Sequence, residues 1–539
     1  MAKVKAKAAD APSTSKELKD TLWKAADKLR GSMDASQYRD VVLGLVFLKY
    51  VSDAFDERRG ELAAELAGEP EDFISETLEE RDEYTGSGVF WVPRECRWEY
   101  LAKHAKGIPA SASNDAQSIG NLIDEAMRGL MDANESLRGV LPTMYGRDNV
   151  DQRRLGELLD LFNSARFAGG GASKARDLLG EVYEYFLDKF AKAEGKRGGE
   201  FYTPQSIVRT LVEILEPHSG RVYDPCCGSG GMFVQAEKFL ERHREDPTNI
   251  AVYGQEFNER TWRMAKMNLA IHGIDTAGLG TVWQDTFARD IHPDIKADYV
   301  LANPPFNIKD WVRREDDPRW RYGVPPARNA NYAWMQHILS KLTAHGEAGV
   351  VMANGTMTSN TGGEGEIRKA MVEGDVVSCI LALPGQLFRG TQIPACVWFF
   401  AKDKSAGKAG KTDRSRQVLF IDASELGYMV DRVERAFSNG EKGDIQRIAN
   451  TFRAWRGRES AIDVYHDVPG FCKTATLDEI KAAGFALTPG RYVGAAEGEV
   501  DGEPIDEKIA RLTKELTTAL DESARLDAVV REQLKRIAQ

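Results

Sequence analysis

Asn303-Pro304-Pro305-Phe306 could form a pocket for a planar amino group. The preceding apolar run, residues 297–302, is typical of a buried parallel strand. Neither proline has an N–H to donate, and the residue before each proline is held extended, so the strand must end in a stiff turn. The turn would present the Asn303 side-chain oxygen and the Pro304 carbonyl as two acceptors for an –NH2 group, with Phe306 as a face for a flipped base. Taken alone, these four residues are equally compatible with an ordinary strand-to-loop turn.

A glycine-rich segment, residues 224–233 (Asp-Pro-Cys-Cys-Gly-Ser-Gly-Gly-Met-Phe), follows another predicted strand and opens a helix. Its glycines would let the backbone approach a ligand at the carboxyl end of the strand, beside a helix N-terminus. A dinucleotide-binding fingerprint requires a third glycine where Phe233 stands. The segment therefore argues against NAD and FAD.

Three further polar residues occupy positions where either a binding or a structural role is expected. Glu256, at the tip of the second predicted strand, could accept hydrogen bonds from ribose hydroxyls or be a solvated carboxylate. Asp285 lies in 284–287, where we expect the third strand to end, and could accept from an adenine amino group or cap a helix. Thr203 precedes Pro204, which is typical of a helix N-cap; Tyr202 and Thr203 could instead close over a carboxylate.

The chain of 539 residues is long enough for about three domains. Residues 1–14 predict a disordered basic tail, and residues 15–165 an α-helical domain with helices over 16–30, 38–55, 117–135 and 151–163. From residue 173 to 495 short apolar strands alternate with helices, which indicates an α/β fold with a doubly wound parallel sheet. Residues 504–539 carry apolar side chains at three- and four-residue steps, a coiled-coil-like pattern that favours pairing with another chain over docking on this one.

The last two predicted strands, Val397–Ala401 and Val418–Ile421, are joined by a Gly/Lys-rich stretch, which predicts an antiparallel hairpin at the edge of the sheet. Within that stretch Gly410-Lys411-Thr412 resembles part of a phosphate-binding loop. Ser405 stands where its first glycine should be, and the flanking pattern is not strand–loop–helix, so we predict a solvated turn and no nucleotide-driven motor.

Composition narrows the class of protein. The six cysteines include no C-x2-C pair, so no metal site is expected, and cysteines scattered in this way are typically reduced and buried. No apolar stretch approaches the length of a membrane span, and no secretory signal opens the chain, so we expect a cytoplasmic protein. The net charge of −11 repels DNA overall, so DNA binding would need a local basic surface or a partner.

Taken together, these motifs resemble a known family. Asp-Pro-x-x-Gly-x-Gly after a strand is similar to the first motif of S-adenosylmethionine-dependent methyltransferases. The order Phe-Tyr-Thr-Pro (201–204), 224–230, Gly-Gln-Glu (254–256), Asp285 and Asn-Pro-Pro-Phe resembles the DNA amino-methyltransferases that act on adenine N6. Segments 180–186, 383–388 and 487–493 extend the resemblance to the modification (M) subunit of type I restriction–modification systems, over about residues 15–539.

The resemblance implies a cofactor, S-adenosyl-L-methionine, and a Rossmann-like methyltransferase fold. It implies that the cofactor is bound by residues of four segments: Glu200, Phe201, Tyr202 and Thr203; Asp224, Cys226, Gly228, Ser229 and Gly230; Glu256; and Asp285. Asn303, Pro304, Pro305 and Phe306 would form the catalytic pocket, in which the two acceptors localise the lone pair of the amino nitrogen for attack on the sulfonium methyl. Neither a metal nor a covalent nucleophile is implied, so Cys226 and Cys227 would not attack the substrate.

The implied partners are double-stranded DNA, a specificity (S) subunit with two M subunits per S, and a motor-bearing restriction (R) subunit. The loop after the pocket is basic and aromatic and could hold DNA near a flipped base, although its acidic residues are also compatible with a solvated loop; its basic and aromatic residues are Lys309, Arg313, Arg314, Arg319, Arg321, Arg328, Trp311, Trp320 and Tyr322.

Two alternatives stay open at this stage. Asn-Pro-Pro-aromatic would serve any planar amide or amine, so the substrate could be RNA or a protein glutamine. An inactive assembly scaffold could retain the fold, although the intact set of Asp224, Glu256 and Asn303 argues against it.

Overall fold

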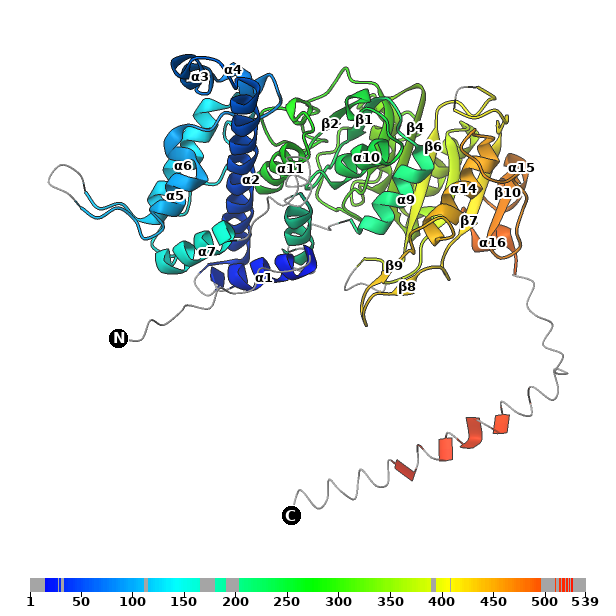
Figure 1. Ribbon diagram of the computed structural model, residues 1–539. Coiled ribbons are helices and arrows are strands. Elements are labelled where there is room, and N and C mark those ends of the chain that lie inside the picture. The colour runs from blue at the N-terminus through cyan, green and yellow to red at the C-terminus, as the bar shows by residue number, and fades with distance from the viewer. Residues whose placement is uncertain are drawn as a thin grey trace.

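The computed structural model describes two regions of different architecture, a group of helices followed by a helix-covered sheet (Figure 1). The residues that it describes are 15–27, 29–30, 33–110, 115–164, 180–190, 203–388, 394–407 and 409–495, with scattered helical positions between 509 and 526. The predicted tail 1–14 and most of the predicted helix 504–539 lie outside them.

The N-terminal region is helical, as predicted. Its elements are α1 (Ser15–Asp27), α2 (Ala35–Glu65), α3 (Glu71–Thr77), α4 (Asp82–Thr85), α5 (Trp98–Lys103), α6 (Ile119–Ala133) and α7 (Gln152–Ser164), with short 3-10 turns at Arg94–Cys96 and Glu135–Leu137. α2 begins after Asp34, whose carboxylate accepts from the Ser36 and Gln37 amides. Because its middle is buried on almost every side, α2 is the axis around which the other helices pack.

The second region is built on one sheet of eight strands, in the order β10-β7-β5-β6-β4-β3-β1-β2. The strands are β1 (Gly220–Asp224), β2 (Ile250–Gly254), β3 (Ala297–Ala302), β4 (Leu342–Ala353), β5 (Val377–Ala382), β6 (Ala395–Ala401), β7 (Gln417–Asp422) and β10 (Cys472–Thr476); β8 (Tyr428–Met429) and β9 (Arg435–Ala436) form a separate two-stranded ribbon. β2, β1, β3 and β4 pair in parallel.

Two predictions about strand pairing are wrong. β6 and β7 do not form an edge hairpin: β6 lies between β4 and β5, antiparallel to both, and β7 pairs with β5 in parallel. The sheet is therefore mixed, with β6 and β10 running against the other strands. The third strand also does not end at 284–287, which is a loop; the strand after β2 is β3. The amino-acid composition of a strand indicates that the strand is buried, but it does not specify which other strand pairs with it.

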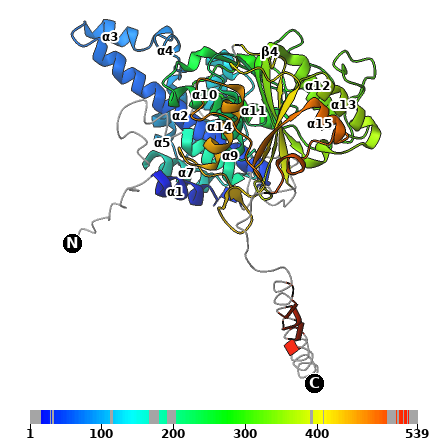
Figure 2. The same cartoon turned by 90° about the vertical axis from the view of Figure 1, so that its right-hand side faces the viewer.

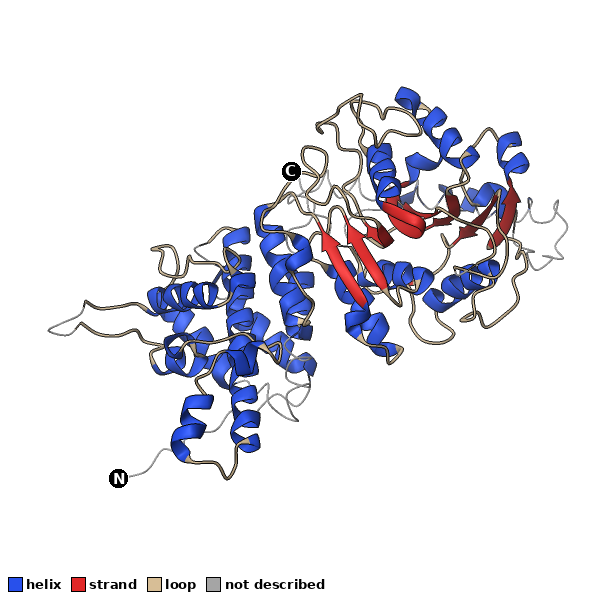
Figure 3. Ribbon diagram, turned by 90° about the horizontal axis from the view of Figure 1, so that it is seen from above, coloured by secondary structure: helices blue, strands red, loops and turns tan. Residues whose placement is uncertain are grey.

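Helices cover both faces of the sheet (Figure 3). Alternate residues of each strand point to opposite faces, so Val222 and Val397 enter one core whereas Tyr223 and Trp398 enter the other. The first core includes α9 (Gln205–Leu215), α10 (Gly231–Arg242) and α14 (Asp444–Arg456). The second includes α12 (Asn331–Lys341), α13 (Glu364–Glu373), α15 (Leu477–Ala482) and α16 (Gly490–Val493). The remaining 3-10 turns are Pro247–Asn249, Ala277–Leu279, Asn354–Met357 and Thr361–Gly363.

The helical region joins the sheet region through α11 (Glu259–Ile271) and the helical residues 180–190. Both contribute buried side chains to the N-terminal core, and the Tyr183 hydroxyl donates to the Met264 carbonyl at 3.4 Å. At the surface of the same contact Arg260 lies 3.7 Å from the Asp40 carboxylate and also bonds Ser36. The two regions therefore share one continuous apolar core on this side.

No helix among the described residues has the length and apolar character needed to cross a bilayer.

The close approach of α2 to residues 142–145 yields a stability prediction. A Cβ at Gly44 would lie 2.2 Å from the Tyr145 hydroxyl and 2.6 Å from Pro142 Cγ, whereas a Cβ at Gly60 of the same helix meets nothing within 4 Å. We expect Gly44→Ala to lower the free energy of unfolding by roughly 1–3 kcal/mol through overpacking. Gly60→Ala should raise it by about 0.5–1 kcal/mol, because alanine is the better helix former. Urea unfolding of both variants checks this, and shifts of equal sign would contradict the packing.

Candidate functional site

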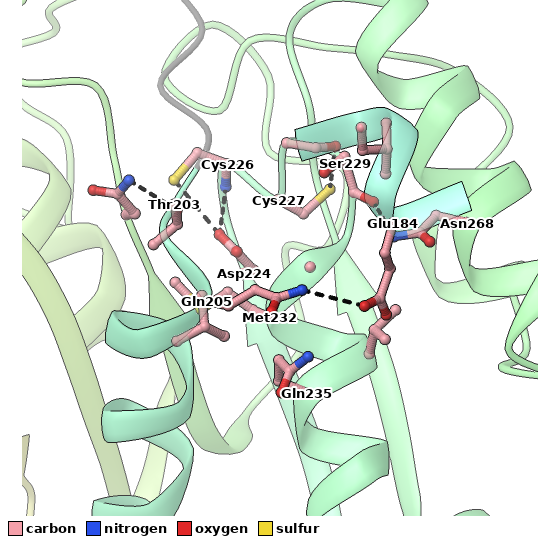
Figure 4. A pocket seen from close by; sticks show the side chains of 16 residues that line it. Glu184, Thr203, Gln205, Asp224, Cys226, Cys227, Ser229, Met232, Gln235 and Asn268 are labelled. Carbon is pink, nitrogen blue, oxygen red and sulfur yellow. Dashed lines mark hydrogen bonds between the residues drawn. The ribbon is translucent and has the colours of Figure 1, made fainter. Parts of the chain in front are cut away.

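β1 and β3 are parallel neighbours, and a pocket lies where their carboxyl ends meet, with Asp224 of β1 and Asn303 after β3 in its wall (Figure 4). The predicted Glu256, after β2, and Asp285 are not among the residues that line it. Residues of helix 180–190, of the start of α9, of the loop after β1 and of α10 contribute to its wall. The lining residues are Glu184, Leu187, Thr203, Gln205, Val208, Asp224, Cys226, Cys227, Gly228, Ser229, Gly231, Met232, Val234, Gln235, Asn268 and Asn303. The pocket thus brings together predicted residues from segments up to 100 positions apart, such as Thr203 and Asn303.

The loop after β1 turns sharply into α10, and its glycines make the turn possible. Gly228 and Gly230 have φ of 54° and 78°, in the left-handed region that glycine adopts most readily. Gly230 is the N-cap of α10 and closes the turn by donating to the Cys227 carbonyl at 2.8 Å. The first turn of α10 is consequently aimed at the pocket.

Asp224, the last residue of β1, is buried at the base of this loop. Burial raises the pKa of its carboxyl group to about 7, against the lowering effect of hydrogen bonds from Cys226. The Cys226 amide donates to Oδ1 at 3.0 Å. A carboxyl group in this position would be stabilised as an anion by any cation that enters the pocket.

Glu256 follows β2 and is tied to the glycine loop. Its Oε2 accepts from the Gly228 amide at 3.0 Å, and its Oε1 accepts from the Asn258 amide at 2.9 Å. These two bonds hold the Glu256 carboxylate in a fixed orientation against the glycine loop.

Asp285 is placed beside Glu256, because the Gln284 amide donates to the Glu256 carbonyl at 2.8 Å. Its Oδ1 accepts from the Phe287 and Ala288 amides at 2.7 and 3.1 Å. Asp285 therefore stabilises its own turn, and the alternative that it caps a helix is wrong, because residues 286–288 form a turn and no helix follows. Both bonds are accepted by Oδ1, so they fix the orientation of the whole carboxylate, including Oδ2.

The Asn303 side chain is oriented from across the pocket. Its Nδ2 donates to the Thr203 hydroxyl at 2.9 Å, while its Oδ1 is buried and has no hydrogen-bond partner among the described residues. Thr203 is not the N-cap of α9; Pro204 occupies that position and no side chain caps the helix. The threonine instead holds the amide so that its oxygen is free to accept.

The two prolines continue from Asn303 as predicted, with Pro304 buried and Pro305 partly buried at the end of β3. Phe306 is partly buried and meets Phe388 edge to face, with ring centroids 6.2 Å apart. Phe388 belongs to the segment after β5, so the strand ends fix the position of the ring. Asn307, with φ of 57°, then turns the chain away and is held by reciprocal bonds with Asn331.

Glu200, Phe201 and Tyr202 lie outside the residues that the structure describes.

Several pocket residues carry a contact that the motifs did not predict. Glu184 accepts from Gln205 Nε2 at 3.3 Å and from His272 Nε2 at 3.1 Å, and also bonds Lys238. Asn268 of α11 donates to the Ser229 carbonyl at 2.8 Å, while its Oδ1 is a second buried acceptor without a partner in the described part of the chain. Only Glu184 lay in a recognisable motif, 180–186; nothing local to Asn268 indicated a role.

Phe257 is the other residue that sequence reasoning missed. It directly follows Glu256 and is 70% exposed at the tip of β2. An exposed aromatic ring next to a carboxylate could stack on a planar heterocycle. Its position immediately after the strand-tip acid was the available signal.

The cysteines do not provide a nucleophile. All six are free, and burial raises the pKa of the Cys226 and Cys227 thiols well above the usual value. In the described part of the chain no group of three or more His, Cys, Asp or Glu side chains could hold a metal ion. Gly410-Lys411-Thr412 forms a turn, as predicted, but the turn is only partly solvated: Lys411 is exposed, whereas Gly410 is buried against residue 456, and the Lys411 and Thr412 amides donate to residues 457 and 456.

The basic loop after the pocket divides into two sets. Arg319 is structural: it pairs with Asp317 and bonds the Thr286 carbonyl and His337, and Trp320 is buried against Phe287. Arg313 is likewise engaged, by Glu315 and the Pro325 carbonyl. Four exposed cations remain available for a polyanion: Lys309, Arg314, Arg321 and Arg328.

Comparison with known proteins places the chain in a family. Residues 174–501 match the N-6 DNA Methylase family, and residues 18–162 match the HsdM N-terminal domain. The type I restriction enzyme HindI methylase subunit of Haemophilus influenzae is 45% identical over 454 residues, covering 82% of this chain and 99% of that protein. The MjaIX methylase subunit of Methanocaldococcus jannaschii is 38% identical and covers 96% of this chain and 90% of that protein.

The fold has solved counterparts. A type I restriction-modification system methyltransferase subunit from Streptococcus thermophilus superposes with a TM-score of 0.72 at 24% identity, covering 89% of this chain and all of that one. A chain from a study of complex assembly in the type I R-M system superposes with a TM-score of 0.58 at 19% identity, covering 97% and 99%. Both likenesses support the α/β methyltransferase fold with a helical N-terminal region.

The bonds of Glu184 yield a pH-dependent stability prediction. Burial tends to raise the pKa of Glu184, but hydrogen bonds and charge from His272 and Lys238 lower it to about 2, from an ordinary value of 4.5. A lowered pKa stabilises the folded state above pH 4.5, and that contribution is lost as the pH falls from 4.5 toward 2. We expect Glu184→Gln to lower the free energy of unfolding by about 3 kcal/mol at pH 7.

Denaturant unfolding at pH 7, 5 and 3 measures this effect, and the difference between wild type and variant should shrink as the solution is acidified. Glu181→Gln is the matched control, because Glu181 pairs with Lys19 at the surface and should change stability by less than about 1 kcal/mol. A difference for Glu184→Gln that does not depend on pH would exclude the charge network as its source.

Proposed function

Because this chain belongs to the N-6 DNA methylase family, as the methylase subunit of a type I restriction–modification system that methylates adenine N6 in DNA, we propose that the pocket at the ends of β1 and β3 is where the methyl group is transferred. We further propose that S-adenosyl-L-methionine occupies the part lined by the glycine loop and that a flipped adenine enters against Asn303. Contacts of the described residues support both the cofactor site and the adenine site.

The observation that carries the proposal is the unpartnered oxygen of Asn303. A buried acceptor without a hydrogen bond costs about 1–3 kcal/mol, so its presence in a pocket argues for a ligand that donates to it. The bond from Nδ2 to Thr203 orients the amide with that oxygen free. The exocyclic amino group of adenine is a donor of the required kind.

The described residues fit the proposed cofactor. Its methionine end carries an ammonium group and a sulfonium, and the pocket offers the buried Asp224 carboxyl group and the unpartnered Asn268 oxygen as partners. Glu256 would accept from the ribose hydroxyls, as an acid at the tip of a second strand does in related α/β folds. Phe257 directly follows Glu256, and the segment of Asp285 is hydrogen-bonded to Glu256 through Gln284; we propose that they contact the adenine ring and its amino group.

The bound cofactor would supply the activated methyl group, and the protein would prepare the amino nitrogen. The N6 lone pair of adenine is delocalised into the ring and is a poor nucleophile. The Asn303 oxygen and the Pro304 carbonyl would accept the two amino hydrogens and localise that lone pair toward the methyl group. Phe306, held by Phe388, would stack on the base, a contact typically worth about 1–3 kcal/mol. Catalysis would then rest on orientation.

DNA and partner subunits would be bound outside the pocket. Lys309, Arg314 and Arg328 are exposed in the loop that follows Asn303 and could contact phosphates despite the net charge of −11. Arg321 is also exposed, but its charge acts on Lys402, which follows β6 at the end of the strands opposite the pocket. For target recognition we propose a specificity subunit bound through the predicted helix 504–539, with two copies of this chain per specificity subunit. A separate restriction subunit would supply the motor.

Replacement of Asn303 tests the proposed catalytic role. Asn303→Ala removes the acceptor, so methyl transfer should fall by about 100- to 1,000-fold, the loss typical of removing one preorganised hydrogen-bonding group. The measurement is transfer of labelled methyl groups to DNA by the chain with its specificity subunit, alongside calorimetric titration of S-adenosylmethionine, which should still bind. Asn249→Ala, at an exposed position, is the control. Loss of cofactor binding together with transfer would show that Asn303 is structural.

The raised pKa of Asp224, about 7, predicts pH-dependent cofactor binding. A cation beside Asp224 favours the ionised carboxylate, so binding must release the proton whenever the pH is below the pKa. Cofactor affinity should therefore rise with pH, by up to about tenfold per unit below pH 7, and level off above it. Calorimetric titration from pH 5.5 to 8.5 measures this. Asp224→Asn should bind more weakly at pH 8 and lose the extra slope; equal slopes would assign the titration to another group.

A further inference from the structure

The β8–β9 ribbon is an exposed apolar element that the pocket does not use. Its four large apolar side chains are about half exposed: Tyr428 54%, Met429 43%, Val430 51% and Val433 44%. Tyr428 pairs with Ala436 and Met429 with Arg435, and the Val430 amide donates to the Glu434 carbonyl at 2.8 Å to close the tip. A short ribbon that presents so much apolar surface is typical of an interaction site.

The ribbon lies at the carboxyl ends of the parallel strands, on the same side of the sheet as the pocket. It follows β7, which runs parallel to β5, and the Arg435 amide donates to the carbonyl of Gln386, in the segment that follows β5. Phe388, two residues further on, contacts Phe306 of the Asn303 turn. The ribbon is thus linked by three short steps to the place where adenine would be held. Figures 1 and 2 show it projecting beyond the body of the sheet region.

The base of the ribbon is packed against the protein core, unlike that of a hairpin exposed to solvent on all sides. Leu426 and Phe437, at its two ends, pack into the core that contains α9 and α14. The guanidinium group of Arg435 folds back and donates to the Leu426 carbonyl at 3.0 Å. The exposed tip is therefore carried on an anchored base that sets its direction.

The ribbon is not built to attract phosphates. Residues 428–436 contain two acidic and two basic side chains, so they carry no net charge. The loop that carries Lys309 and Arg328 offers exposed cations instead, and its aromatic residues pack in a separate cluster with α12. Phosphate contacts and apolar contacts are thus divided between two elements beside one pocket.

We propose that the β8–β9 ribbon is a DNA wedge, whose apolar tip enters the duplex beside the target and stabilises the stack from which adenine has been extruded. Apolar side chains inserted at base steps are an established way to hold a distorted duplex, and extrusion of a base unstacks and unpairs it, leaving a gap in the stack. A protein subunit bound to the ribbon would occupy the side of the pocket from which the adenine enters, which argues for DNA as the partner of the ribbon. The inference rests on the proposed extrusion of adenine toward Asn303.

The test is Val430→Ser/Val433→Ser, assayed in the complex of the full chain with its specificity subunit, on a duplex containing the mapped target. Transfer to the fully paired duplex should fall at least tenfold. A mismatch opposite the target adenine lowers the cost of extrusion, so transfer to the mismatched duplex should stay within about threefold of wild type. Cofactor binding should not change. Val464→Ser, at a valine that is 88% exposed outside the ribbon, is the matched control and should match wild type on both duplexes.

Unchanged transfer to the paired duplex would overturn the proposal, as would equal losses on both duplexes. Failure of the variant to co-purify with the specificity subunit would also overturn it, by identifying the ribbon as a protein-docking surface. If the double variant does not fold, Val433→Ser alone gives the same comparison. The loss of methyl transfer in Asn303→Ala tests the proposed function of the pocket separately. The wedge proposal and the proposed function can therefore fail independently.

Discussion

The proposed site depends on the side-chain amide of Asn303, whose nitrogen is hydrogen-bonded within the described chain and whose oxygen is not. Asn303 donates through Nδ2 to Thr203, while its Oδ1 is withdrawn from water and has no partner in the described chain. Folding normally satisfies buried acceptors, so an unsatisfied one persists only where the surroundings hold it in place. Here the Pro304-Pro305 turn stiffens the backbone and Thr203 fixes the amide. In our proposal the missing bond is the one that adenine supplies.

The rest of the sheet region serves to bring that amide to the glycine loop. β1 and β3 are neighbours and parallel, so Asp224 and Asn303 end at the same edge. The antiparallel β6 in the middle of the sheet does not alter this, because it lies beyond β4. The segment after β5 is nevertheless on the pocket side, which allows Phe388 to support Phe306. A mixed sheet can therefore carry the same arrangement of strand ends as a parallel one.

The helical region also contributes to the pocket. Helix 180–190 packs in the N-terminal core, yet its Glu184 lines the pocket and bonds side chains of α9, of α10 and of His272, the C-cap of α11. A movement of the N-terminal helices relative to the sheet would therefore disturb the wall beside the glycine loop. This provides a physical route by which a partner bound to one region could influence the other.

Charge is organised locally. The chain carries a net charge of −11, but four cations in the loop after Asn303 are exposed and form no ion pair with the residues that the structure describes. Arg319, which the sequence grouped with them, is used to hold the loop against Thr286 and His337. Sequence proximity could not distinguish these roles, because the difference lies in which partners each guanidinium group meets after folding.

The sequence by itself determined the elements whose chemistry is local: the helices of the N-terminal region, the central strands, the glycine turn at 228–230 and the proline turn at 303–306. Each depends on backbone preferences of adjacent residues. Only the tertiary structure decided that β6 lies inside the sheet, that Thr203 orients Asn303 instead of capping a helix, and that Glu184 and Asn268 line the pocket. These contacts join residues far apart in the chain, and their free energy comes from packing and burial that no short segment contains.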